Sequence, residues 1–290
     1  MRSYLFTPSD QIRKLAKARS SGADVVILDL EDSIAWDKKE SARRLAFDFL
    51  QDQQSQKNRP LFYVRINGLE SELAQQDLEH ILPARPDAIL LPKCQSARDV
   101  QHLSVKLSVL EAQNNIEPGA TKIMPLACET AASLFHMGSL INASIRLIAL
   151  CWGAEDLAFD LGAHHTRQSD GSFTSPMQMA RALTLAAARA ADIIPIDAVY
   201  TDLRNQDGLR QECLRAAKDG FEGKLAIHPD QIDIINETFS PSPEDLAYAQ
   251  DIISAFVQNP DQGAIQFEGR MIDRVHLQRA HNLIKRQSGL

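Results

Sequence analysis

Charged side chains recur directly after short apolar runs along this chain, where they could act together on a ligand. They are Asp29, Glu31, Asp32, Arg65, Lys93, Glu129, Glu155 and Asp156. Carboxylates that converge on one site raise one another's pKa unless a cation offsets their charge. No cysteine cluster or His-x-x-x-His motif accompanies them in the sequence. Oxygen donors of this kind favour Mg²⁺, with Mn²⁺ as the second choice, over zinc.

Glu129 and Asp156 are the best pair of metal ligands by position, because they follow neighbouring apolar runs and Mg²⁺ usually takes one or two carboxylates. Arg65 closes another run, and its guanidinium group suits a substrate carboxylate. The alternative for Arg65 is a structural ion pair with Glu31 or Asp32. An arginine and a metal together can hold a 2-keto acid.

Eight short β-rich runs alternate with longer amphipathic stretches and are the elements that must position these side chains. The expected strands are residues 3–7, 25–29, 61–66, 88–91, 122–127, 145–151, 194–200 and 223–227. Two of them, 25–29 and 145–151, are almost continuously apolar, which is typical of parallel strands covered on both faces. Residues 11–20 and 99–110 have helical spacing, and Ser9-Asp10, Ser71 and Ser96 are expected to cap helices.

This alternation over residues 1–236 predicts a (β/α)8 TIM barrel, whose active site would lie at the carboxyl ends of the strands. A doubly wound open sheet is the alternative, although the first strand is not followed by a glycine-rich fingerprint. The long connection 153–178 has the length of a functional or mobile loop. It contains His164-His165, a weaker metal candidate because adjacent loop residues point in different directions.

Residues 237–290 do not continue the barrel pattern. A Ser-Pro-Ser-Pro segment precedes an expected helix over 244–258, a short hairpin or extended arm over 266–273, and a last helix over 275–286. We expect a small C-terminal helical arm or lid.

Composition excludes several classes of protein. The 290 residues carry a net charge of -7 and are 44% hydrophobic and 24% charged, as in an ordinary globular protein. No apolar run reaches the roughly 18 residues of a membrane span, and the first residues form no signal-peptide core. The excess of acidic residues disfavours binding to nucleic acid. The four cysteines are far apart in the sequence, which suggests buried free thiols. We expect a cytoplasmic protein that acts on a small molecule.

The motifs, in their order along the chain, resemble the citrate lyase β subunit family, which includes malyl-CoA and citramalyl-CoA lyases. They are Arg2-Ser3-x-Leu5-Phe6-Thr7-Pro8, Val26-Ile27-Leu28-Asp29-Leu30-Glu31-Asp32-Ser33, Val64-Arg65-Ile66-Asn67, Leu91-Pro92-Lys93, Glu129-Thr130-Ala131, Gly153-Ala154-Glu155-Asp156-Leu157 and Gly223-Lys224-x-Ala226-Ile227-His228-Pro229. The resemblance covers nearly the whole chain. It implies a TIM barrel that uses Mg²⁺ to cleave citramalyl-CoA, malyl-CoA or citryl-CoA into acetyl-CoA and a 2-keto acid.

The resemblance also assigns roles to residues. Glu129 and Asp156 would bind the metal, and Arg65 would clamp the substrate carboxylate. The residues that touch substrate would be Arg65, Glu129 and Lys93. Glu31 and Asp32 would be catalytic by holding metal-bound water and ordering the site.

In the resembled family, an aspartate in the C-terminal arm reaches the active site of a neighbouring subunit, and Gly269-Arg270-Met271-Ile272-Asp273 matches that segment. Asp273 would then exchange a proton with the acetyl-CoA enolate, in a homo-oligomer that is a trimer or a dimer of trimers; the alternative is that Asp273 only caps the helix that follows. CoA phosphates would meet Arg2 and Lys14, unless these form a solvated basic face. Two other functions stay open: a CoA-independent 2-keto-acid aldolase, and a citrate lyase β subunit active only within a complex.

Overall fold

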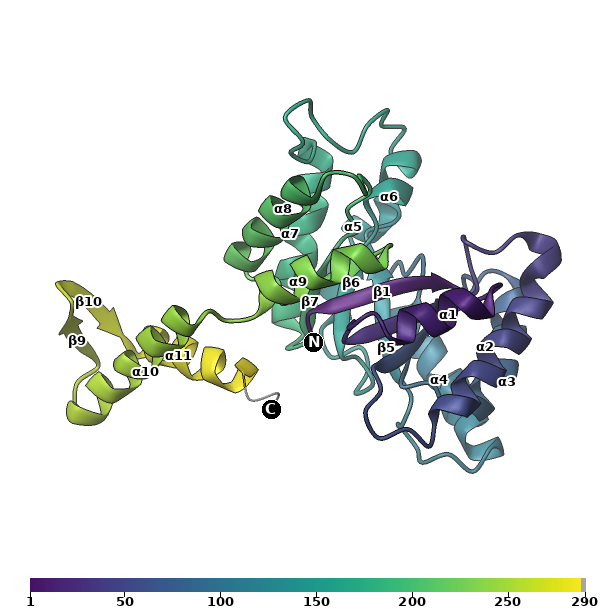
Figure 1. Cartoon of the computed structure of the whole chain (residues 1–290), viewed down its shortest axis with the longest axis horizontal. Coiled ribbons are helices and arrows are strands. Elements are labelled where there is room, and N and C mark those ends of the chain that lie inside the picture. Colours follow the sequence, from purple (N-terminus) through teal and green to yellow (C-terminus); the bar gives the residue numbers. More distant parts are fainter. Residues whose placement is uncertain (288–290) are drawn as a thin grey trace. The chain divides into compact units, whose positions relative to one another are not determined.

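The computed structural model describes residues 1–287, and the chain divides into two compact units, Met1–Asn236 and Glu237–Leu290. The first unit is a closed barrel of eight parallel strands in chain order (Figure 1). Its strands are β1 (Ser3–Pro8), β2 (Val25–Asp29), β3 (Leu61–Arg65), β4 (Ala88–Leu91), β5 (Lys122–Ala127), β6 (Ala149–Trp152), β7 (Ile194–Asp197) and β8 (Gly223–Ala226). Because β1 pairs with both β2 and β8, the predicted TIM barrel is confirmed and the open sheet is excluded.

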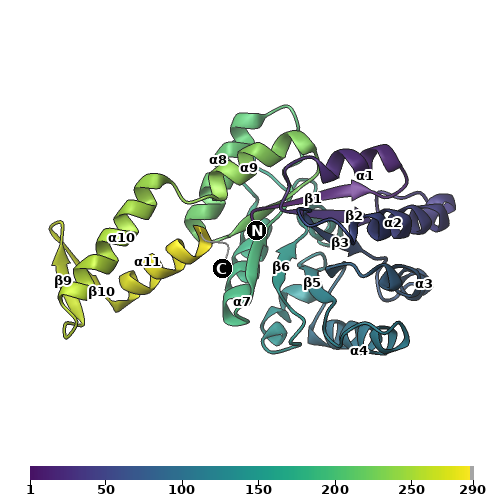
Figure 2. The same cartoon turned by 60° about the horizontal axis from the view of Figure 1, so that its bottom comes forward.

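Helices follow the strands and cover the outside of the barrel; Figure 2 shows α1 to α4 beside one another there. The α-helices of this unit are α1 (Ile12–Arg19), α2 (Lys39–Gln53), α3 (Glu72–Ile81), α4 (Ala97–Gln113), α5 (Ala131–Leu134), α6 (Ala154–Asp160), α7 (Ser175–Ala190), α8 (Gln206–Asp219) and α9 (Ile232–Phe239). Short 3-10 turns are η1 (Trp36–Lys38), η2 (Leu82–Ala84), η3 (Met137–Leu140) and η4 (Pro229–Gln231).

Inward-facing side chains of the strands fill the barrel, so it is a packed core that fixes the strand ends. Tyr4, Ile27, Tyr63, Leu90 and Met124 belong to one buried cluster and are at most 1% exposed. Every residue of β2 is buried, as its continuous apolar run predicts. The chemistry must therefore lie at the strand ends and their loops.

Helix starts agree only partly with the expected caps. The hydroxyl groups of Ser71 and Ser96 accept backbone hydrogen bonds at the starts of α3 and α4, and Asp99 completes a capping box with Ser96. The prediction that Ser9-Asp10 caps the first helix is wrong, because α1 follows Gln11, which forms no side-chain cap.

Strand β6 begins four residues later than its apolar run. Ile145 is 95% exposed, whereas Arg146 is buried against Glu111 at 2.6 Å. The amide of Leu147 closes a turn on Ser144. The segment before Ala149 therefore brings a buried ion pair to the barrel and pairs with β5 only through an isolated bridge at Leu147.

The second unit contains α10 (Pro243–Gln258), an antiparallel hairpin of β9 (Ala264–Phe267) and β10 (Arg270–Asp273), and α11 (Arg274–Gln287). The hairpin turns through Glu268 and Gly269, whose φ angles of 47° and 76° suit a two-residue turn. The unit has its own small core, including Ile252, Phe256 and Ile272.

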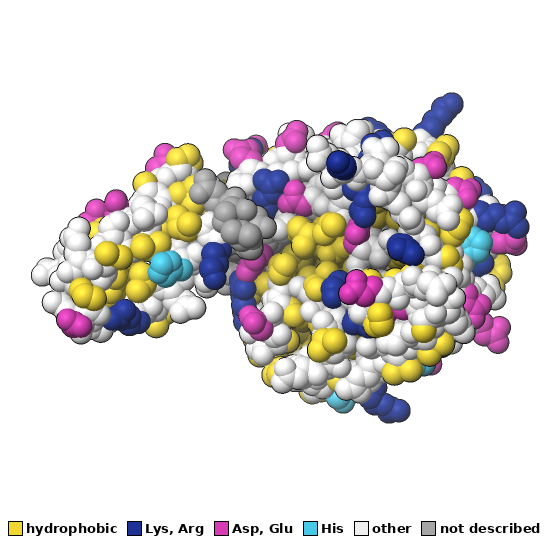
Figure 3. Space-filling view, turned by 90° about the horizontal axis from the view of Figure 1, so that it is seen from below, with side chains coloured by type: hydrophobic (Ala, Val, Ile, Leu, Met, Phe, Trp, Pro, Cys, Tyr) yellow, Lys and Arg dark blue, Asp and Glu magenta, His cyan; other side chains and the backbone are white. Residues whose placement is uncertain are grey.

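Among residues 1–287, no helix has the length and apolarity to span a bilayer. Lys and Arg are interspersed with Asp and Glu on the face shown in Figure 3.

Candidate active site

Arg65 lies at the end of β3 and holds the carboxylates that follow β2. Its Nε and Nη2 donate to the two oxygens of Asp29 at 2.7 and 2.6 Å, while Nη1 lies 3.0 Å from Glu31 and 3.4 Å from Asp32. The guanidinium also covers the ring of Phe6, 4.8 Å from its centroid. Arg65 thus makes the structural ion pairs that the sequence left as an alternative, with Asp29 as an additional partner.

The opposite charges of Asp29 and Arg65 keep both groups ionised although they are buried. Burial alone would raise the pKa of Asp29, but the adjacent Arg65 outweighs it and holds that pKa below its ordinary value. Burial would likewise lower the pKa of Arg65, and Asp29 raises it instead. Asp29 also accepts the backbone N–H groups of Glu31 and Ser33, which fixes the start of the loop after β2.

Lys93 connects this acidic loop to the next part of the site. Its Nζ lies 2.7 Å from Glu31 and 3.8 Å from Asp32. The Glu31 carboxylate is buried and Asp32 is half exposed. A cavity of about 570 Å³ opens beside these three residues and is also lined by Asn67 and Thr130.

Glu129 follows β5 and its carboxyl group is almost fully buried. One oxygen accepts the backbone N–H of Lys93, and the other, Oε1, has no hydrogen-bond partner among the described residues. Burial raises the pKa of Glu129 well above its ordinary value, and the negative charges of Asp156 and Glu31 raise it further. A buried carboxylate with an open oxygen and like charges nearby is suited to a cation.

Gly153 makes room for this carboxylate. A Cβ atom at position 153 would lie 2.8 Å from Cγ and 3.1 Å from Oε1 of Glu129. Gly153 caps α6, whose first turn carries the partly buried Asp156 and the exposed Glu155.

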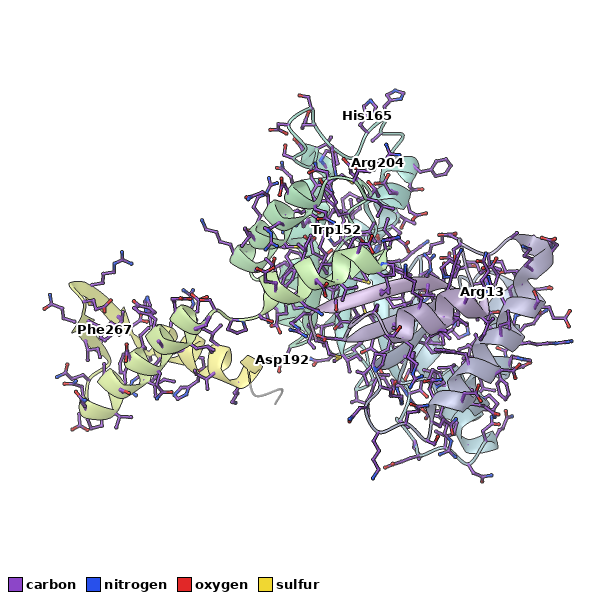
Figure 4. All side chains as sticks on the ribbon, viewed as in Figure 1. Arg13, Trp152, His165, Asp192, Arg204 and Phe267 are labelled. Carbon is purple, nitrogen blue, oxygen red and sulfur yellow. The ribbon has the colours of Figure 1, made fainter. Side chains whose placement is uncertain are left out.

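The donor set fits a hard cation. No group of three or more His, Cys, Asp or Glu residues that could hold a metal is found within residues 1–287. Glu129 and Asp156 would supply two carboxylates, and Mg²⁺ typically completes such a site with water and substrate oxygens. His165 lies on the loop between α6 and α7 (Figure 4), and its side chain is exposed.

Arg2 is not brought to the site. It precedes β1, at the amino ends of the strands, where its guanidinium binds Asp24 at 2.9 Å. Glu129 follows β5 at the opposite, carboxyl ends. Arg2 thus lies at the end of the barrel opposite Glu129, and its contact with CoA phosphates stays a prediction.

Lys14 is placed differently from Arg2. It is exposed on α1 and, with Lys17, lines a cavity of about 320 Å³ beside Thr7 and His228, near the carboxyl ends of β1 and β8.

Asp273 ends β10 in the second unit and caps α11. Its Oδ1 accepts the backbone N–H groups of Val275 and His276 at 3.0 and 3.3 Å and contacts Nδ1 of His276 at 2.7 Å. Hydrogen bonds from His276 lower the pKa of Asp273 from its ordinary value. The structure thus shows the capping arrangement, and a role in a neighbouring subunit stays a prediction.

Sequence reasoning missed the contacts by which two polar residues, Lys39 and Asn67, hold the loop after β2. Lys39 Nζ donates to the carbonyl oxygens of Leu30 and Glu31 and to Oδ1 of Asn67. Asn67 was noted as a polar residue at the end of the third strand, but its contacts were not predicted: its side chain links Leu30 to the buried Asp77. The sequence around Lys39 gives no signal that a lysine at the start of a helix would bind the loop after β2.

Similarity to known proteins agrees with this geometry. The model of the HpcH/HpaI aldolase/citrate lyase family matches residues 2–229, nearly the whole barrel unit. This chain belongs to the HpcH/HpaI aldolase/citrate lyase family. The predicted resemblance to citrate lyase β subunits, and with it the class of carbon–carbon lyases, is confirmed.

Relatives within the HpcH/HpaI aldolase/citrate lyase family match the chain from end to end. A protein named (3S)-malyl-CoA thioesterase from Cereibacter sphaeroides is 34% identical, covering 100% of this chain and 95% of that protein. The mitochondrial citramalyl-CoA lyase of Rattus norvegicus is 33% identical, covering 98% and 85%. The crystal structure of CitE from Mycobacterium tuberculosis, in complex with magnesium, acetoacetate and coenzyme A, is 31% identical, with a TM-score of 0.81 over 99% of this chain and 98% of that one.

Proposed function

We propose that this protein is a Mg²⁺-dependent lyase that cleaves a 3-hydroxy-3-carboxyl acyl-CoA, such as citramalyl-CoA, malyl-CoA or citryl-CoA, into acetyl-CoA and a 2-keto acid. The observation that carries the proposal is the buried Glu129 carboxylate, which has an open oxygen and Asp156 nearby, on the same barrel rim as Arg65. The magnesium and CoA named for the similar CitE structure support it.

In this proposal Glu129 and Asp156 hold Mg²⁺, which would act as a Lewis acid toward the 2-keto acid. Arg65 binds the substrate carboxylate: Asp29 occupies two of its five N–H donors, and the half-exposed Asp32 is the partner that a ligand can displace. Lys93 contacts the same ligand from the other side, while Glu31 keeps both cations in place.

The CoA moiety is proposed to lie along the cavity beside Thr7 and His228. Lys14 and Lys17 line that cavity and have charged groups suited to phosphates. Both side chains are exposed and therefore accessible to a ligand.

Asp273 is proposed to exchange the proton with the acetyl-CoA methyl carbon in a neighbouring subunit. Asp273 is a carboxylate at neutral pH, as an aspartate of ordinary or lowered pKa is, and this form accepts a proton in the synthetic direction. Met271 shares a face of β10 with Asp273, since residues two apart in a strand point the same way, and is 78% exposed. An exposed apolar neighbour of this kind suits a subunit contact and supports a homo-oligomer, either a trimer or a dimer of trimers.

The test is mass spectrometry of the purified protein with the three thioesters and Mg²⁺, alongside Glu129→Gln as the inactive control. We expect acetyl-CoA and the matching 2-keto acid from at least one thioester, with no product after chelation by EDTA. Absence of acetyl-CoA from all three thioesters, in a folded sample that binds Mg²⁺ by calorimetry, would refute the proposal.

A second candidate function is hydrolysis of the thioester, because the similar Cereibacter protein is named a (3S)-malyl-CoA thioesterase. The same assay separates the two: hydrolysis yields free CoA thiol and the intact hydroxy acid, whereas cleavage yields acetyl-CoA. Turnover of free hydroxy acids would instead favour the CoA-independent aldolase. Activity that appears only after co-purified subunits are added would favour the citrate lyase β subunit.

A further inference from the structure

The side chain of Lys39, the first residue of α2, is fully used in hydrogen bonds to the loop after β2. Its Nζ lies 2.8 Å from the carbonyl oxygen of Leu30, 2.7 Å from that of Glu31 and 2.9 Å from Oδ1 of Asn67. An ammonium group has three N–H donors, and these three acceptors satisfy all of them. Lys39 therefore has no donor left for a ligand, although it lines the cavity beside Glu31.

The contacts of Lys39 continue into a buried network. Asn67 Nδ2 donates to the same Leu30 carbonyl at 3.1 Å and to Asp77 at 2.6 Å. Asp77 in turn binds Nε of Arg43 at 2.6 Å, and both side chains are almost completely buried. The loop after β2 is thus tied through Lys39 and Asn67 to α2 and α3, which are rigid elements of the barrel wall.

The anchored loop carries the carboxylate that meets two cations of the candidate site. Glu31 contacts Nη1 of Arg65 at 3.0 Å and Nζ of Lys93 at 2.7 Å. On the backbone side, Asp29 holds the N–H of Glu31 and Lys39 holds its carbonyl oxygen. Loss of the Lys39 contact would free one side of this peptide segment while leaving the other in place.

We propose that Lys39 is a positioning residue for the lyase reaction: it fixes the Leu30–Glu31 backbone so that the Glu31 carboxylate stays between Arg65 and Lys93. The role in the reaction rests on the proposed function, whereas the effect on Glu31 is independent of it. A misplacement of about 1 Å in a catalytic arrangement can reduce the rate about 100-fold.

The kinetic test compares Lys39→Met, which keeps the chain length and removes the donors, with Lys39→Arg and with Lys38→Met. Lys38 is the matched control, because it is 56% exposed and its nearest ion-pair partner, Asp10, is 4.0 Å away. With the three thioesters and Mg²⁺, we expect Lys39→Met to lower kcat about 10- to 100-fold while KM changes by less than about threefold. Lys39→Arg should recover part of kcat, and Lys38→Met should match the wild type.

A crystal structure of Lys39→Met with Mg²⁺ gives a readout that needs no turnover. We expect the Glu31 carboxylate to move beyond 4 Å from Arg65 or Lys93. A Glu31 carboxylate that keeps both contacts, or a Lys39→Met enzyme with the kcat of the wild type, would overturn the role of Lys39. A wild-type protein that cleaves no thioester overturns the proposed function instead, and the position of Glu31 then decides the role of Lys39.

Discussion

Alanine at position 153 tests whether Glu129 holds a cation. The backbone of Gly153 is extended, with φ -116° and ψ 106°, so alanine is allowed there without strain. Its Cβ would lie 2.8 Å from Cγ of Glu129, whereas ordinary contact begins at 3.4 Å, so the side chain must retreat by about 0.6 Å (3.4 − 2.8). Mg²⁺ demands near-ideal octahedral geometry at about 2.0–2.1 Å from its ligands. A displacement of this size should weaken binding about 10- to 100-fold, as loss of supporting residues does at other metal sites.

Calorimetry with MgCl₂ on EDTA-stripped protein measures the effect directly, and thermal unfolding provides a second assay. At about 100 times its Kd, Mg²⁺ should stabilise the wild type by about 2.7 kcal/mol, which corresponds to a rise of roughly 5–10 °C in Tm. Gly153→Ala should lose about half of this rise if binding weakens 10-fold, and most of it if binding weakens 100-fold. Gly138→Ala is the control, since no atom lies within 4 Å of its added Cβ. Wild-type Mg²⁺ affinity in a folded Gly153→Ala protein would refute the assignment of Glu129 as a ligand.

Three further outcomes are expected. Arg65→Lys keeps the charge but loses the planar fork, so kcat/KM for the cleaved thioester should fall at least about tenfold; unchanged kinetics would contradict the carboxylate clamp. Burial would raise the pKa of Asp197, but the adjacent Lys224 outweighs burial and lowers that pKa. The ionised Asp197 therefore stabilises the folded protein above its unfolded pKa of about 3.9, and this stabilisation is lost as the pH falls through the lower folded pKa. Asp197→Asn should therefore cost about 3–5 kcal/mol at pH 7 in urea unfolding and less at pH 3.5; an equal loss at both pH values would argue against this ion pair. Mixed subunits of Asp273→Ala and Glu129→Gln, each inactive alone, should regain activity in the lyase assay if the arm crosses between subunits; a mixture that stays inactive would count against the crossing.

The fold followed from the sequence because a parallel barrel strand leaves a local signal. A run such as Val25–Asp29 is apolar at every position before its last residue, Asp29, and its bounds in the structure are the predicted ones. The same signal misplaced the start of β6, because Arg146 sits inside an apolar run and its buried partner Glu111 is 35 residues away. Ion pairs between distant elements leave no local pattern.

The sequence predicted which charged residues lie at the strand ends, but it did not predict which groups these residues contact. Arg65 was expected to meet a substrate carboxylate or to pair with Glu31 or Asp32, and the structure adds Asp29 as its partner. Lys39 was missed because its three acceptors are backbone and amide oxygens, which every sequence contains. Arg2 lies at the amino end of β1, where it pairs with Asp24, because the strand direction decides which charges reach the carboxyl ends of the strands.

Lys93 explains how the acidic groups at the barrel mouth are held in one arrangement. It adopts a left-handed backbone with φ 53°, a conformation that costs a residue with a side chain roughly 1–2 kcal/mol and glycine almost nothing. That backbone turns its N–H toward Glu129 while its Nζ reaches Glu31 at 2.7 Å. A glycine would keep the first contact and lose the second. Cys128, immediately before Glu129, is also left-handed, with φ 52°. Strained residues thus persist on both sides of the Glu129 carboxylate, where the contacts they make require a side chain as well as an unusual backbone.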